Sequence, residues 1–231
     1  MGVAGTGSAN VALLGPAGVG KTTFAEIICA VLYETGRIRE PRMLDVTGDW
    51  FRANYVGQTG TRTEAAIQFS RGGVLFIDEA YLMTDSAGSD FGAQAMGTLV
   101  NDMDKLDDLV VIVAGYDEEM QEFFAQNPGM ASRVRTHIHM RPYTVRELML
   151  ILQRMAKAQG FKVAPDVYRT LQPGVERAMG SRDFGQARAM RNCVEAMIAA
   201  HALRWNRDPE HVEKMLLDHV DAAEAMSKFG W

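Results

Sequence analysis

The feature that most constrains this chain is a glycine-rich loop set between an apolar run and a helical pattern. The loop matches the phosphate-binding consensus G-x-x-x-x-G-K-[ST] over Gly15 to Thr22. It directly follows the apolar run 11–14, and apolar residues recur at helical spacing from Phe24 to Leu32 after it. Strand, loop and helix in this order are the context that the motif requires. The sequence therefore predicts a triphosphate site at the start of this helix.

Each part of the loop has a chemical role in this interpretation. Glycines let backbone N–H groups turn inward around phosphate oxygens, and the helix that follows adds the positive end of its dipole. We expect Lys21 to contact the β and γ phosphates of ATP, and Thr22 to offer its hydroxyl to Mg²⁺. A chance glycine-rich turn is the less favoured alternative. The predicted nucleotide contacts in this segment are Gly15, Pro16, Ala17, Gly18, Val19, Gly20, Lys21, Thr22 and Thr23.

Two acidic residues end a second apolar run. Residues 74–77 are Val-Leu-Phe-Ile and lead directly into Asp78 and Glu79. Ligands of open α/β sheets bind at the carboxyl ends of the strands, so we expect both acids beside the phosphate loop. There Asp78 would hold the Mg²⁺ shell and Glu79 would polarise an attacking water. Acids that are merely solvated at a strand end are the alternative.

The first 140 residues alternate between apolar runs and helical patterns. Runs at 11–14, 74–77 and 109–113 indicate strands buried on both faces, and helices are expected at 61–70, 91–106 and 117–126. This alternation predicts an α/β fold of the P-loop type, a parallel sheet with helices on both faces. From Arg141 onward the pattern is helical throughout, and Thr144 and Glu147 form a capping-box pair.

We therefore expect three parts: a flexible lead-in at 1–9, a nucleotide-binding domain at 10–140 and a small all-helical lid domain at 141–231.

Composition and net charge limit the classes of partner that this chain is expected to bind. The net charge of −5 argues against nucleic acid, because affinity for the phosphate backbone comes from Lys and Arg. No apolar run approaches the roughly 20 residues that span a bilayer, and no signal segment is evident, so we expect a cytoplasmic protein without membrane insertion. Cys29 and Cys193 are expected to be buried free thiols. His137 and His139 alternate on a predicted strand without a third ligand nearby, so we expect strand-surface residues.

Several more segments carry a resemblance to a known family. They are Tyr55-Val56-Gly57-Gln58-Thr59, the stretch from Gly73 to Tyr81, Asp90-Phe91-Gly92, Ala114-Gly115-Tyr116, Asn127-Pro128-Gly129 and Ser132-Arg133. With the phosphate loop, they resemble AAA+ ATPases of the CbbX/CfxQ family over about Asn10 to Ala200. That family includes red-type Rubisco activases, stage V sporulation protein K and the ATPase domains of type VII secretion proteins.

The resemblance implies roles for several residues. Arg133 is expected to be the arginine finger that reaches the γ-phosphate held by a neighbouring subunit, with Arg135 as the competing candidate. The segment from Gly185 to Asn192 is similar to the sensor-2 segment of the family, which makes Arg188 the expected nucleotide contact. Arg191, one turn along the same helix face, is the alternative. The sensor-1 position falls on Tyr116 or Asp117, where many AAA+ proteins carry Asn.

A pore loop is implied as well. Tyr55, Val56 and Gly57 stand where AAA+ unfoldases present an aromatic residue, an apolar residue and glycine to a central pore. Tyr55 would grip a client chain, and the alternative is an aromatic ring folded back onto its own domain.

Two functions from different classes follow. The first is an ATP-driven protein-remodelling motor that threads or tugs a protein client, either as a homo-oligomer, expected to be a hexameric ring, or with tandem AAA+ neighbours. The alternative is a nucleotide-gated assembly scaffold with slow or no turnover. A nucleic-acid translocase has only fold analogy in its favour.

Overall fold

The computed structural model describes residues 9–51, 58–84, 90–181 and 183–231, in two compact units. The first unit extends to Met140, and the second runs from Arg141 to Trp231, with Ala17–Val19 grouped with the second. Of the expected lead-in at 1–9, residues 1–8 lie outside the described part of the chain.

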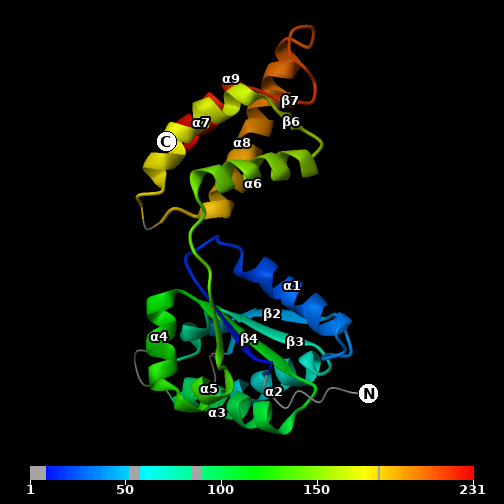
Figure 1. Cartoon of the computed structure of the whole chain (residues 1–231), viewed down its shortest axis with the longest axis vertical. Helices are drawn as coiled ribbons and strands as arrows, with labels where there is room; N and C mark the ends of the chain where they lie inside the picture. Colours follow the sequence, from blue (N-terminus) through cyan, green and yellow to red (C-terminus); the bar gives the residue numbers. More distant parts are fainter. Residues whose placement is uncertain (1–8, 52–57, 85–89, 182) are drawn as a thin grey trace. The chain divides into compact units, whose positions relative to one another are not determined.

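The first unit is built on a parallel sheet, of which Figure 1 labels β2, β3 and β4. The strand order is β2-β3-β4-β1-β5. The strands are β1 (Val11–Leu14), β2 (Met43–Thr47), β3 (Val74–Asp78), β4 (Val110–Gly115) and β5 (Thr136–His139). The three apolar runs expected as strands correspond to β1, β3 and β4. These strands are the central ones and are almost entirely buried, whereas β2 and β5 lie at the edges and are more exposed. Because all strands are parallel, their carboxyl ends share one edge.

Helices cover both faces of this sheet. One face carries α1 (Lys21–Glu34), which packs Ala25 and Cys29 against strand residues such as Phe76. The other face carries α2 (Gln58–Ser70), α3 (Asp90–Lys105), α4 (Asp117–Gln126) and α5 (Pro128–Arg133). Successive strand residues enter opposite cores, as for Phe76 and Ile77, because side chains alternate along a strand. The predicted α/β fold class is confirmed.

Three short elements were not part of the sequence prediction. The segment Asn127-Pro128-Gly129 ends α4 as expected, but Pro128 also begins the short helix α5. Proline suits the first position of a helix because it lacks an N–H and has a preset φ. A 3₁₀ turn, η2 (Ala80–Met83), follows β3, and another, η1 (Gly48–Phe51), follows β2.

The second unit consists of four helices around their own core. These are α6 (Val145–Ala158), α7 (Pro165–Ala178), α8 (Gln186–Arg207) and α9 (His219–Phe229). The predicted capping box at the start of α6 is present: the Glu147 N–H donates to the Thr144 hydroxyl oxygen, and the Glu147 carboxylate accepts from the Thr144 N–H.

The second unit is helical, as expected, except at one place. Two short strands, β6 (Lys162–Val163) and β7 (Leu216–Leu217), pair in parallel between the helices. The Lys162 N–H donates to the Met215 carbonyl and the Ala164 N–H to the Leu217 carbonyl, both at 2.9 Å. This pairing satisfies backbone groups that loops would otherwise bury unpaired.

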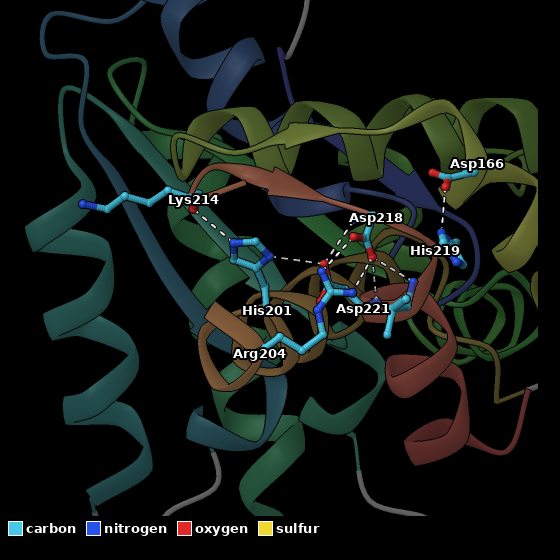
Figure 2. Close-up of polar contacts among 8 residues, drawn as sticks. Asp166, His201, Arg204, Lys214, Asp218, His219 and Asp221 are labelled. Atoms are coloured by element: carbon cyan, nitrogen blue, oxygen red, sulfur yellow. Dashed lines mark hydrogen bonds and ion pairs between the residues drawn. The ribbon is translucent and has the colours of Figure 1, made fainter. Parts of the chain in front are cut away.

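A buried polar cluster ties α8 to α9 (Figure 2). The His201 Nε2 atom lies 3.0 Å from the Lys214 carbonyl oxygen, which can only accept, so Nε2 carries a hydrogen. Its Nδ1 atom lies 3.3 Å from a carboxylate oxygen of Asp221, which is fully buried. Arg204 donates two hydrogen bonds of 2.7 Å to Asp218, the residue that caps α9. The cluster therefore fixes how α9 begins against α8.

Other expectations concern single residues. Cys29 and Cys193 are buried and free, as predicted. His137 and His139 are exposed on β5, as expected; His137 stacks on Phe124, and His139 Nδ1 lies 2.8 Å from an Asp117 carboxylate oxygen. Among the helices of the described residues, none combines the length and apolar character needed to cross a bilayer.

Candidate nucleotide and catalytic site

Glycines occupy the positions of the phosphate loop that demand unusual backbone angles. Gly15, Gly18 and Gly20 have φ values of 149°, 70° and 92°, in the region that favours glycine. Gly15 also has a space constraint, because a Cβ there would lie 2.4 Å from the carbonyl oxygen of Met140. Helix α1 then begins at Lys21 without a side-chain cap from Gly20, an arrangement in which first-turn N–H groups can receive an anion.

Lys21 is held beneath this loop and is only 9% exposed. Its ammonium group donates to the carbonyl oxygens of Gly15, at 2.8 Å, and Pro16, at 3.1 Å. It also lies 5.1 Å from the centre of the Tyr116 ring, at the end of β4. Thr22 is partly buried and Thr23 is exposed, both in the first turn of α1.

The two acids lie at the same edge of the sheet as the loop. Strand β4 separates β1 from β3, and the Gly15 N–H donates to the Gly115 carbonyl at 3.2 Å. On the other side of β4, Ile77 pairs with Val113, so Asp78 follows at the carboxyl edge. The register of the strands thus brings the phosphate loop and the acidic pair together.

Glu79 has a strained backbone. Its φ and ψ are 49° and 47°, a left-handed conformation that non-glycine residues adopt rarely and that recurs at functional sites. Its N–H donates to the Asp78 carboxylate at 3.0 Å, and its carbonyl accepts from the Leu82 N–H at 2.8 Å. Gly48 lies tightly against it, since a Cβ on Gly48 would stand 2.4 Å from the Glu79 carbonyl oxygen. No sequence motif pointed to Gly48.

The donor set at this edge fits a magnesium ion. Asp78 offers carboxylate oxygens and Thr22 a hydroxyl, the oxygen ligands that Mg²⁺ prefers. Negative charge is concentrated around Asp45 on β2. Burial raises the pKa of its carboxyl, and the negative charges of Asp78 and Glu26 raise it further. A divalent cation would offset this concentration of negative charge.

Arg133 is not brought to the phosphate loop of its own chain. It ends α5, immediately before β5, and therefore lies at the amino edge of the sheet. Asn10, which precedes β1, donates to the Arg133 carbonyl at 3.4 Å and accepts from the Val111 N–H at 2.8 Å. The Arg133 guanidinium forms a two-point ion pair with Asp104 of α3, a partner that sequence reasoning missed. Arg135 is exposed and donates to the Ser132 carbonyl.

Arg188 and Arg191 belong to the second unit, where both are exposed near the start of α8. Gln186, at the start of the same helix, is the second described non-glycine residue with positive φ, 46°. Its side-chain oxygen accepts from the Tyr143 N–H at 3.0 Å. A cavity of about 510 Å³ in this unit is lined by Arg188 together with Phe184, Asn192 and Trp231, among others.

Three other predicted residues lie outside the described residues. Tyr55, Val56 and Gly57 fall within 52–57, so their proposed role in a pore loop stays a prediction.

Comparison with known proteins gives the family. Residues 11–142 match the ATPase family associated with various cellular activities (AAA), and residues 144–229 match the AAA lid domain. A chloroplastic ribulose bisphosphate carboxylase/oxygenase activase from Cyanidioschyzon merolae (strain NIES-3377 / 10D) is 36% identical over 188 residues, 80% of this chain and 64% of that protein. Protein CfxQ of Xanthobacter flavus is 35% identical over 202 residues, 87% of this chain and 64% of that protein.

Solved structures agree on the fold. The AAA domain of FIGL-1 shares 16% identity and a TM-score of 0.63, covering 96% of this chain and 71% of that one. The same domain is known in complex with ADP, with a TM-score of 0.61 to this chain, 17% identity, and coverage of 95% of this chain and 71% of that one. The sequence-based assignment to AAA+ ATPases of the CfxQ type is confirmed. The chain spans about 64% of the length of the activase and CfxQ relatives, and it belongs to the AAA family of ATPases.

Proposed function

We propose that this chain binds Mg²⁺·ATP and hydrolyses it to ADP and phosphate as one subunit of a ring that remodels a protein client. The observation that carries the proposal is the meeting of the phosphate loop and the Asp78-Glu79 pair at one edge of the sheet. Family membership supports a nucleotide as the ligand.

The roles follow from the chemistry of each side chain. Backbone N–H groups of the loop and the ammonium of Lys21 would bind the phosphates, where negative charge grows during hydrolysis. Thr22 and Asp78 would hold Mg²⁺, which when bound neutralises phosphate charge. Glu79 would orient the attacking water and accept its proton, and its strained, anchored backbone keeps the carboxylate in a set place.

The position of Arg133 argues for more than one subunit. Strand β1 is four residues long, so at ~3.3 Å per residue the two edges of the sheet are about 13 Å apart. An arginine at the amino edge cannot reach its own phosphate loop across this distance. A neighbouring copy would supply the finger, so that turnover depends on assembly.

Contacts from the lid and the pore complete the proposal. Arg188, or Arg191 one turn further, would contact the nucleotide from the second unit. Tyr55, Val56 and Gly57 would grip the client, a role that rests on the resemblance alone. The relatives named as Rubisco activase make an enzyme assembly the kind of client we propose to test first.

Mixing two inactive variants tests the site and the assembly together. Glu79→Gln retains the finger and Arg133→Ala retains the carboxylate, so each alone should lose ATPase activity. Random mixing should restore activity at about one quarter of the interfaces, where Glu79 of one copy meets Arg133 of the next.

Arg135→Ala is the matched control and should behave like the wild type, since its side chain is exposed and bonds only locally. Failure of the mixture to regain activity would show that Arg133 does not act in trans. Tight nucleotide binding with no wild-type turnover would favour the scaffold alternative.

A further inference from the structure

An aromatic ring lies beside Lys21 at the carboxyl edge of the sheet, and a second ring packs against the first. Tyr116 follows β4 and is the N-cap residue of α4, and its ring centre is 5.1 Å from the Lys21 ammonium nitrogen. Tyr81 of η2 packs on it, with ring centres 6.0 Å apart and planes tilted by 30°. Lys21 of α1, Tyr116 at the end of β4 and Tyr81 of η2 therefore form a continuous row of contacts.

The environment of the lysine favours contact with a ring face. The Gly15 and Pro16 carbonyls accept two of the three ammonium hydrogens. The charge of the buried group also needs favourable electrostatic surroundings, and the negative face of an aromatic ring supplies them. Carbonyls and a ring hold a cation less strongly than a carboxylate does, so the lysine can still exchange these contacts for phosphate oxygens.

Asp117, the other candidate for the sensor-1 position, has a different partner. The carboxylate of Asp117 lies 2.8 Å from His139 Nδ1 on β5 and is 44% exposed. Of the two residues that the sequence left open for the sensor-1 position, Tyr116 is thus the one in contact with the phosphate-loop lysine.

Tyr81 packs against the Tyr116 ring. Burial first, and then the negative charge of Glu79, raises the pKa of the Tyr81 phenol well above its usual range, so it stays neutral. Gly115 makes room for this ring, because a Cβ there would lie 3.0 Å from the Tyr81 Cδ1 atom and 2.7 Å from the Met120 sulfur.

We infer that Tyr116 is a positioning residue for Lys21, acting through the face of its ring and not through its hydroxyl. The ring holds the ammonium group at the phosphate loop, and Tyr81 supports the ring. This inference rests on the proposed function, since Lys21 acts there on the phosphates of ATP.

Substitutions that separate the ring from the hydroxyl test the inference. Tyr116→Phe keeps the ring face and should match the wild type in Kd for a magnesium complex of a non-hydrolysable ATP analogue and in kcat/KM. Tyr116→Leu removes it and should weaken both about tenfold, as expected for a cation–π contact at a desolvated site. Thermal unfolding of both variants shows whether the fold is kept.

A second measurement holds even if the leucine variant does not fold. A fluorinated phenylalanine at position 116 keeps the ring shape but withdraws electron density from its face, so nucleotide affinity should fall with each added fluorine while Tm stays constant. A purely structural ring would show no such series.

The outcomes separate the inference from the proposed function. Equal loss of nucleotide affinity in the Phe and Leu variants would assign the role to the hydroxyl. A Leu variant with wild-type affinity, or no change in affinity across the fluorine series, would show that the ring has no such role. Each of these results overturns the inference. A wild type that binds the analogue without turning over ATP overturns the proposed hydrolysis only, because the binding series still tests Tyr116. A wild type that binds no nucleotide overturns both.

Discussion

Gly48 gives the sharpest test of how the structure positions Glu79, the carboxylate proposed to activate water. It is buried at the start of η1, and a Cβ there would lie 2.4 Å from the Glu79 carbonyl oxygen and 3.0 Å from the Met83 nitrogen. Both neighbours are backbone atoms, so no change of rotamer can relieve the contact. Gly48→Ala must therefore move the backbone of Glu79 or of η1.

The size of the effect can be worked from these distances. Ordinary contact begins at 3.4 Å, so the backbone must give way by about 1 Å. Overpacking of this kind costs about 1–3 kcal/mol of unfolding free energy, which lowers Tm by roughly 2–12 °C in a chain of this size. A shift of about 1 Å in a catalytic group can reduce kcat about a hundredfold. The KM for ATP should change little, because Lys21 and its loop are not displaced.

Steady-state ATPase assays and thermal unfolding measure these quantities. Gly97→Ala is the matched control: Gly97 lies on the exposed side of α3 with nothing within 4 Å of an added Cβ. Its substitution should stabilise the helix by about 0.5–1 kcal/mol and leave kcat unchanged. A Gly48→Ala enzyme with wild-type kcat would refute the claim that Gly48 sets the place of Glu79.

Three more predictions concern stability and reactivity. The Arg141 guanidinium, aided by the Thr144 N–H and hydroxyl, lowers the pKa of Glu147 from 4.5 to about 2. The stability that the Glu147 carboxylate adds is therefore present above pH 4.5 and is lost as pH falls to 2. The Tm difference between wild type and Glu147→Gln should vanish near pH 2. Burial raises the pKa of Cys193 to about 12, so its thiol should react with a thiol reagent only after unfolding, as denaturant titration can show. Asp221→Ala should lower the unfolding free energy by about 3 kcal/mol in urea titrations, because it removes the buried carboxylate that accepts from the Asp218 N–H and pairs with Arg204, and a fall below 1 kcal/mol would contradict this.

The sequence predicted the central strands because their apolar runs have no polar interruption. No residue range was predicted for strand β2, because Asp45 interrupts its apolar pattern and an edge strand need not be apolar on both faces. The pair β6 and β7 has two residues in each strand, too few for any periodicity. Its formation depends on where the helices bring the loops, which only the folded unit determines.

The candidate site likewise has parts that the sequence predicts and parts that only the folded structure shows. The phosphate loop and the acidic pair are continuous segments, so their chemistry can be identified from the residues alone. The contacts of Tyr116 with Lys21 and of Gly48 with Glu79 join residues far apart in sequence, through strand order and close packing. Nothing in the sequence near Glu79 indicated its positive φ, because the surrounding fold imposes that strain.

The ion pair between Arg133 and Asp104 bears on how a finger can serve a neighbouring copy. The Asp104 side chain is 56% exposed, and an ion pair this open to water contributes at most about 1 kcal/mol. A triphosphate offers more negative charge and bidentate oxygens, so the guanidinium can leave Asp104 at small cost. Until then the pair, with the Gly129 carbonyl that accepts from Arg133 at 2.8 Å, holds the guanidinium in place at the end of α5. Asp104→Asn should therefore leave stability nearly unchanged and alter only the dependence of ATPase activity on protein concentration, whereas Asp104 would be a structural residue if Tm fell by more than about 5 °C.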